Sequence, residues 1–327
     1  MIRRLPAPSP ASLETPGEAM KFAEYNTAAT TAVAARPTTT SVIASSRFPR
    51  LKRAQLFARK HRSSITIAVA LVFLVAFMLS GVLFPLPFSP TKPDVEAIGL
   101  APSATHFFGT DGFGFDVYSR VLDAGGRDIP IALAGALVAL ALGVPVGIAA
   151  SGGKLGDILM RGLDGFSALP ILILVIVAIR LMGGSAFDIV VAIAIVNTPR
   201  FARLVRAEAV ALRSKRFVEA AVAAGASPLR IAVQHIVRNA YGIVLVQTTL
   251  AAANAIGVIA ALNFLGVGTT PPTPTWGGMI RDGMTLLIDG RWWASAFPTV
   301  AIFLVVVAFN AIADGIEARA EATGGHS

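Results

Sequence analysis

Long apolar runs separated by polar segments are the dominant pattern of this chain. A helix rises 1.5 Å per residue, so it needs about 20 apolar residues to cross the hydrocarbon core of a bilayer. Six runs approach this length, and the fourth joins two shorter runs across Pro199. They cover residues 65–84, 129–150, 168–182, 187–210, 241–265 and 294–313. The pattern therefore predicts an all-α polytopic membrane protein with six transmembrane helices.

Composition supports a membrane protein and narrows its chemistry. Of 327 residues, 54% are hydrophobic and only 14% are charged, whereas about 25% of the residues of a soluble domain are charged. The chain has no Cys, which excludes disulfides, thiolate metal sites and Cys nucleophiles. The four His show no pair at metal-ligand spacing. We therefore expect neither a metal site nor a cofactor in this chain.

The net charge of +9 has two explanations, nucleic-acid binding and membrane topology. Basic residues concentrate before the first apolar run and in 198–239, whereas 85–128 is acidic and 266–294 is balanced. Cytoplasmic loops carry an excess of Lys and Arg, so both termini and 198–239 are expected to be cytoplasmic. Topology explains the charge. We expect a multi-pass protein of the plasma or inner membrane that contacts the lipid bilayer and no nucleic acid.

The organisation of the chain follows from these assignments. Residues 1–46 are rich in Ala, Thr, Pro and Ser, and we expect a disordered tail; three Glu in this stretch count against a transit peptide. Residues 47–128 comprise a basic flank, the first transmembrane helix and an external segment. The main transmembrane domain is expected over 129–318, and 319–327 form a C-terminal tail.

The cytoplasmic segment 213–239 predicts a helix–turn–helix. Its first part, Arg216–Ala224, is rich in Ala and favours a helix. Gly225 interrupts this helix, where a left-handed backbone suits only Gly. Ser227 and Pro228 then fit the N-cap and first position of a second helix. Docking to a soluble partner and an amphipathic helix lying on the lipid surface are both compatible with this pattern.

Four segments carry a resemblance to a known family. EAAVAAGAS resembles the EAA loop of ABC importer permeases, with Glu219, Ala220, Ala221 and Gly225 at the motif positions. Three further segments resemble the C-type subunit of the dipeptide/oligopeptide/nickel branch: FGTDGFGFDVYSR, FLGVGTTPPTPTWGGMI and FPTVAIFLVVVAFNAIADGI. They occur in family order, and the similarity covers about residues 50–318. One departure is Phe115, which stands where the family has Arg in Gly-Arg-Asp.

This resemblance implies an ABC type I importer fold and a coupling mechanism. In that family the loop docks in a cleft of an ATP-binding subunit, and ATP-driven closure switches the helices between inward and outward access. The implied partners are a second permease subunit as heterodimer, two ATP-binding subunits that hold ATP and Mg, and an external solute-binding protein. The implied substrate is a dipeptide, an oligopeptide or a related small solute such as nickel. The implied coupling residues are Glu219, Ala220, Ala221, Gly225, Ser227 and Pro228.

Two other classes remain as alternatives. A membrane-embedded enzyme would need a catalytic constellation within the spans, and none stands out. A secondary transporter, not coupled to an ATPase, usually carries internal repeats and buried ionisable groups. The chain has no Gly-x-x-x-x-Gly-Lys-Ser/Thr loop, so ATP is expected on a partner. We expect a transporter subunit and not an enzyme.

Several residues outside the loop have expected roles. Asp111 and Asp116 fit a capped, hydrogen-bonded turn better than a cation site. Three Gly of the second span, Gly135, Gly143 and Gly147, would allow close packing against a partner permease.

The Trp residues fit one common role. Trp276, Trp292 and Trp293 flank spans on the outer side and predict an aromatic belt at the membrane interface.

Overall fold

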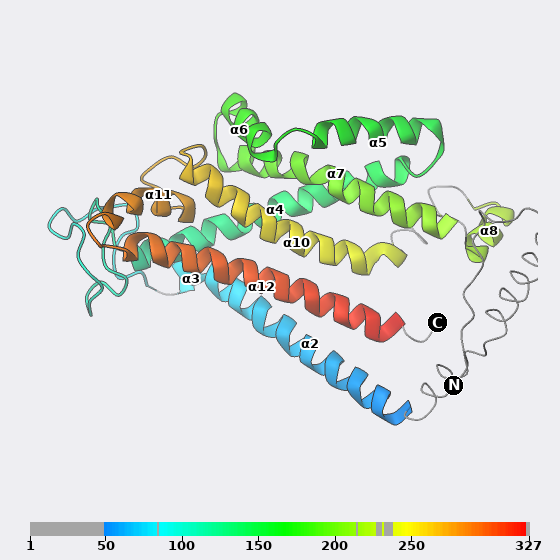
Figure 1. Cartoon of the computed structure of the whole chain (residues 1–327), viewed down its shortest axis with the longest axis horizontal. Coiled ribbons are helices and arrows are strands. Elements are labelled where there is room, and N and C mark those ends of the chain that lie inside the picture. Colours follow the sequence, from blue (N-terminus) through cyan, green and yellow to red (C-terminus); the bar gives the residue numbers. More distant parts are fainter. Residues whose placement is uncertain (1–48, 84, 214, 227–230, 232–237, 325–327) are drawn as a thin grey trace, which may run out of the picture. The chain divides into compact units, whose positions relative to one another are not determined.

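A computed structural model of the chain describes residues 49–83, 85–213, 215–226, 231 and 238–324. The chain divides into two units, Met1–Phe57 and Ala58–Ser327. In the first unit the described part is the beginning of helix α2, and the remaining elements belong to the second unit. The described residues are mostly helical and contain no strand, apart from one isolated bridge between Thr110 and Asp116 (Figure 1). The predicted tail over 1–46 lies outside them.

Ten helices are described. They are α2 (Pro49–Met78), α3 (Ser80–Leu83), α4 (Val117–Ala149), α5 (Gly153–Ser167), α6 (Ile171–Met182), α7 (Ala186–Arg213), α8 (Arg216–Ala223), α10 (Arg238–Phe264), α11 (Trp276–Leu287) and α12 (Trp293–Gly324). By length and composition, three of them can cross a membrane: Val117–Ala149, Ala240–Phe264 and Trp293–Ala320. The chain is thus a helical protein with several candidate membrane spans.

Helices α4 and α7 form the closest pair because α4 presents glycines to α7. A Cβ atom added at Gly135 would lie 2.6 Å from Ile193 Cγ2, and one at Gly147 would lie 2.8 Å from Val205 Cβ. Both contacts pair residues 58 positions apart (193−135 and 205−147), so the two helices run parallel. Gly143 likewise meets Phe201. These glycines were expected to contact a partner permease, and that expectation is wrong for this face, which α7 of the same chain occupies.

The remaining long helices pack in antiparallel fashion. The start of α10 lies beside the end of α12, where a Cβ at Gly242 would be 4.0 Å from Ala320 Cβ. The end of α12 also lies beside the beginning of the apolar part of α2, since a Cβ at Gly315 would be 2.5 Å from Ile67 Cγ1. Figure 1 shows α12 between α10 and α2. Small side chains therefore set the close approach at both interfaces.

The predicted third span, 168–182, corresponds to helix α6, which is only 12 residues long. It follows α5, a helix of 15 residues that the apolar runs did not predict. Gly156–Ser167 and Ile171–Met182 together are apolar enough for one span, but they are bent by 90°. The helix at the predicted second span, 129–150, is longer than expected. Helix α4 begins at Val117, so Pro130 lies inside it.

The segment after α10, expected to be a loop, contains helix α11. Trp276, the first residue of α11, is fully buried, and its indole Nε1 donates to the Val121 carbonyl oxygen at 3.0 Å. Its backbone N–H donates to Asp128 Oδ2 at 3.2 Å. Trp276 is therefore a core residue that joins α11 to α4, and its assignment to an interfacial belt is wrong. Of the other two Trp residues in that assignment, Trp292 is exposed, whereas Trp293 is buried, so the belt assignment is wrong for Trp293 as well.

Residues 94–116, which we name the capping segment, cover the ends of α4 and α12. The Trp293 indole Nε1, from α12, donates to the Thr110 carbonyl oxygen at 3.0 Å. Asp116 is buried and accepts from the Ser119 backbone N–H at 2.7 Å, which caps α4. The segment has few regular elements, but it is fixed by buried hydrogen bonds.

Candidate functional site

The predicted coupling residues begin in α8, a helix of eight residues directly after α7. Glu219, Ala220 and Ala221 all lie within it. A tight turn connects the two helices, with the Lys215 N–H donating to the Leu212 carbonyl at 3.0 Å. The Ala220 side chain is exposed. The first helix of the predicted helix–turn–helix is therefore present, within one residue of its expected bounds.

Gly225 follows α8 in the left-handed conformation that only glycine adopts without strain. Its φ is +80°. A Cβ atom added there would meet no atom within 4 Å, so the backbone conformation and not lack of space makes glycine necessary. This position, just beyond a helix end, is where left-handed glycines commonly stop helices. Ser227 and Pro228 lie outside the described residues, as does most of the predicted second helix.

Two ion pairs join α5 to the half of α7 that leads into α8. Arg203 Nη1 lies 3.1 Å from Asp164 Oδ1 and also donates to Ser167 Oγ at 3.2 Å. Arg206, one turn later, pairs with Asp157. About 60% of each Asp side chain is exposed, so each pair contributes at most about 1 kcal/mol. Their effect is mainly to orient α5 along α7.

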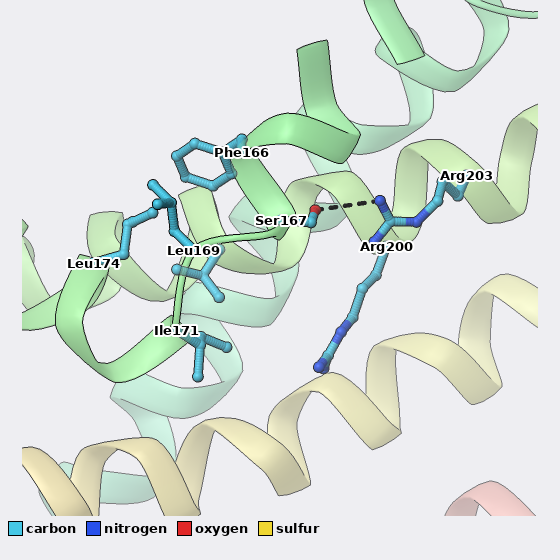
Figure 2. A pocket seen from close by; sticks show the side chains of 8 residues that line it. Phe166, Ser167, Leu169, Ile171, Leu174, Arg200 and Arg203 are labelled. Atoms are coloured by element: carbon cyan, nitrogen blue, oxygen red, sulfur yellow. Dashed lines mark hydrogen bonds between the residues drawn. The ribbon is translucent and has the colours of Figure 1, made fainter. Parts of the chain in front are cut away.

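A cavity of about 270 Å³ lies at the elbow between α5 and α6, next to α7. In Figure 2 the Arg203 guanidinium faces Ser167, whereas Arg200 extends in another direction from the same helix. The other lining residues are mostly apolar: Phe166, Leu169, Ile171, Leu174 and Val196. The cavity thus combines an apolar wall with two guanidinium groups.

Sequence reasoning missed the contribution of α5. A signal was present, because Asp157 and Asp164 are seven residues apart and therefore share one helix face. Arg203 and Arg206 are three apart and also share a face. The pattern indicates a charged stripe on each helix, but which stripe faces which depends on the tertiary structure.

The acidic residues of the capping segment form the expected hydrogen-bonded turn. Asp111 Oδ1 accepts from the backbone N–H groups of Phe113 and Phe115, each at 2.9 Å. Asp116 Oδ1 lies 2.9 Å from His106 Nδ1. Burial raises the pKa of the Asp111 carboxyl group above its ordinary value, partly offset by the two backbone donors. Within the described residues, no cluster of three or more His, Cys, Asp or Glu could hold a metal ion.

Comparison with known proteins places this architecture in a family. Residues 129–322 match the family described as "Binding-protein-dependent transport system inner membrane component". A putative peptide transport system permease protein of Brucella suis is 37% identical over 265 residues, which is 80% of this chain and 89% of the relative. The probable D,D-dipeptide transport system permease protein DdpC of Escherichia coli is 35% identical over 85% of this chain and 94% of its own length.

A third relative comes from another bacterium. The dipeptide transport system permease protein DppC of Alkalihalophilus pseudofirmus is 35% identical over 80% of this chain and 87% of its own length. The family match over residues 129–322 includes the segment with α8 and Gly225. The chain is a membrane permease subunit and not an enzyme, and it belongs to the family of inner membrane components of binding-protein-dependent transport systems, as the resemblance predicted.

Proposed function

We propose that this chain is the C-type membrane subunit of an ATP-driven importer whose substrates are dipeptides or oligopeptides. Three relatives at 35–37% identity are named as peptide or dipeptide permeases, and their names support the substrate class. The proposed assembly contains a second permease subunit, two ATP-binding subunits that hold ATP and Mg, and an external solute-binding protein. The family description, which names a binding-protein-dependent system, supports the last of these partners.

The proposed topology has six membrane crossings, made by α2, α4, the bent pair α5–α6, α7, α10 and α12. The parallel arrangement of α4 and α7 supports this topology. Two parallel spans require one crossing in the opposite direction between them, and the bent pair α5–α6 lies between α4 and α7 in the chain. The antiparallel contacts of α12 with α2 and α10 support the remaining reversals. The basic residues of α7 and of the flank before α2 favour a cytoplasmic location for both termini and for α8.

In the proposed mechanism, α8 transmits the closure of the ATP-binding subunits to the membrane helices. Glu219, Ala220 and Ala221 lie on the docking helix, while Gly225, Ser227 and Pro228 shape the turn that follows it. The observation that carries this proposal is the short helix α8 next to a left-handed Gly225, at the end of a helix that packs along α4 through glycines. Because α4 and α7 contact so closely, a force on α8 would move them together.

Two substitutions at Gly225 test this role. Gly225→Val places a β-branched residue at positive φ, whereas Gly225→Asn places there the residue that tolerates this conformation best. Neither side chain meets a neighbour at its Cβ position. In the reconstituted transporter we expect Val to lower ATP-dependent dipeptide uptake about tenfold, from a strain on the order of 1–2 kcal/mol, and Asn to retain most of it.

Two further measurements separate the explanations. Membrane content of the subunit and co-purification of the ATP-binding subunits are compared between both variants. Equal uptake by Gly225→Val and wild type, with the subunit present, contradicts the coupling role. If less of the subunit is found in the membrane, but the subunit that remains still co-purifies with the ATP-binding subunits, the lipid-surface helix is favoured instead.

A further inference from the structure

A second cavity, of about 210 Å³, lies beside the capping segment and is separate from the α5–α7 elbow. It lies among the first turn of α4, the turn after Asp111, the segment before α11, and α11 itself. The residues that line it combine apolar and polar groups: Phe113, Phe115, Arg120, Asn263, Thr269, Pro271, Pro272, Thr273, Thr275, Gly278, Arg281 and Asp282. Neither the coupling role nor the family motifs assign a function to it.

The wall of this cavity contains a buried guanidinium group without a full set of acceptors. Arg120 is 5% exposed, and its Nε and Nη1 atoms have no hydrogen-bond partner. The Phe115 ring covers one face of the guanidinium, with Cζ 4.0 Å from the ring centroid. A buried cation without an acceptor is unfavourable, and a ring face offsets only part of that penalty. Phe115 stands where the family that this chain resembles has Arg. The contact of an aromatic ring with the Arg120 guanidinium is therefore a feature of this chain.

The neighbouring carboxylates are engaged elsewhere. Asp111 accepts two backbone N–H groups; burial raises the pKa of its carboxyl group, while these donors and the charge of Arg120 lower it. Asp282 Oδ1 accepts from Arg281 Nε at 2.9 Å. Within the described part of the chain, no carboxylate lies at ion-pair distance from Arg120. Asp111 and Asp282 act on the charge of Arg120 only through space, so its Nε and Nη1 donors are available to an incoming anion.

We propose that this cavity binds the carboxylate of a small solute, with Arg120 as the group that receives it. Guanidinium groups pair with carboxylates through two parallel hydrogen bonds, which fixes the orientation of the bound group. The proposed topology places the cavity at the outer end of the membrane helices. Identification of the solute with a transported peptide, through its C-terminal carboxylate, rests on the proposed function.

The test measures binding of dialanine and of its C-terminal amide to the complete transporter in nanodiscs, without ATP and without the solute-binding protein. We expect the amide to bind at least about tenfold more weakly, because it lacks the charge-assisted hydrogen bonds. Arg120→Gln should weaken dialanine binding by a similar factor and leave amide binding unchanged. Arg281→Gln is the matched control, since Arg281 lines the same cavity but is paired with Asp282, and should change dialanine binding less than about threefold.

A second variant covers the case in which Arg120→Gln fails to assemble. Thr273→Phe adds a large side chain at another lining residue and retains Arg120, and it should also abolish dialanine binding. Equal affinity for dialanine and its amide, or unchanged binding in Thr273→Phe, overturns the proposal. Because binding is measured without ATP, these results do not depend on the outcome at Gly225.

Discussion

The capping segment and α8 lie at opposite ends of α4 and α7, and they are held in different ways. The capping segment is fixed by buried polar contacts, such as Trp293 to Thr110 and His106 to Asp116. Among the described side chains of α8, Val218 is buried, whereas Arg216, Ala220 and Ala223 are exposed. Buried hydrogen bonds are costly to break, whereas an exposed helix with few contacts opens readily.

This contrast suits a transporter that moves one end against the other. The capping segment gives the ends of α4 and α12 a fixed arrangement. In the proposed mechanism, a displacement of α8 would pass through α7 to α4, because these two helices contact each other closely at glycines. The capping segment is therefore the proposed fixed end, and α8 is the proposed moving end.

The largest expected effect comes from breaking the fixed end. Asp116→Ala removes the cap of α4 and the partner of buried His106. We expect the free energy of unfolding to fall by about 2–4 kcal/mol, from about 1 for a lost cap and about 1–3 for an unpaired buried group. Thermal unfolding of the solubilised complex measures it.

The control for this experiment is Asp157→Ala, which removes an exposed ion pair near the other end. We expect a loss below about 1 kcal/mol. Equal losses in the two variants would mean that the two ends are held equally firmly, and the comparison would be wrong.

A smaller effect is expected where α5 contacts α7. The double substitution of Arg203 and Arg206 by Ala removes both ion pairs. We expect it to lower the free energy of unfolding by less than about 2 kcal/mol, since exposed pairs contribute up to about 1 each. Half-molar salt should reduce the difference from wild type, because salt screens exposed charges.

Arg200→Ala provides a matched control on the same helix. Among the described residues Arg200 forms no ion pair, so its loss should change stability less than the double substitution. If salt leaves the difference between wild type and the double variant unchanged, the two pairs do not determine how α5 lies on α7.

The smallest effect concerns the pH dependence of the capping segment. Burial raises the folded-state pKa of Asp111 above its value in the unfolded chain, so the folded state retains the proton to higher pH. The associated stability is fully present below pH 3.8 and is lost as pH rises through the folded-state pKa. Asp111→Asn keeps an oxygen acceptor for Phe113 and Phe115 but removes the titration.

We expect wild type to lose stability relative to Asp111→Asn as pH increases from about 4 to 7. Melting temperatures of the two proteins across this range measure the difference. Parallel curves would show that Asp111 has the same pKa in both states, and its burial would then have no electrostatic consequence.

The sequence predicted part of the fold and part of the site. Apolar length located α4, α10 and α12, and the Ala-rich stretch before Gly225 located α8. It missed α5 and α11 because both are short and amphipathic, and their apolar residues do not form a continuous run. Trp276 was misassigned because its position in the sequence, between two predicted spans, does not tell whether its indole faces lipid or the core.

Length, apolar runs and charge distribution by themselves determined that the chain is a helical membrane protein, because the bilayer sets the required length of each helix. Glycine at position 225 also indicated a turn, since backbone sterics act locally. Only the tertiary structure decided that the glycines of α4 face α7, that Arg203 and Arg206 meet α5, and that Arg120 is buried beside a cavity. These features depend on which surfaces meet, and residues far apart in the chain supply the two sides of each contact.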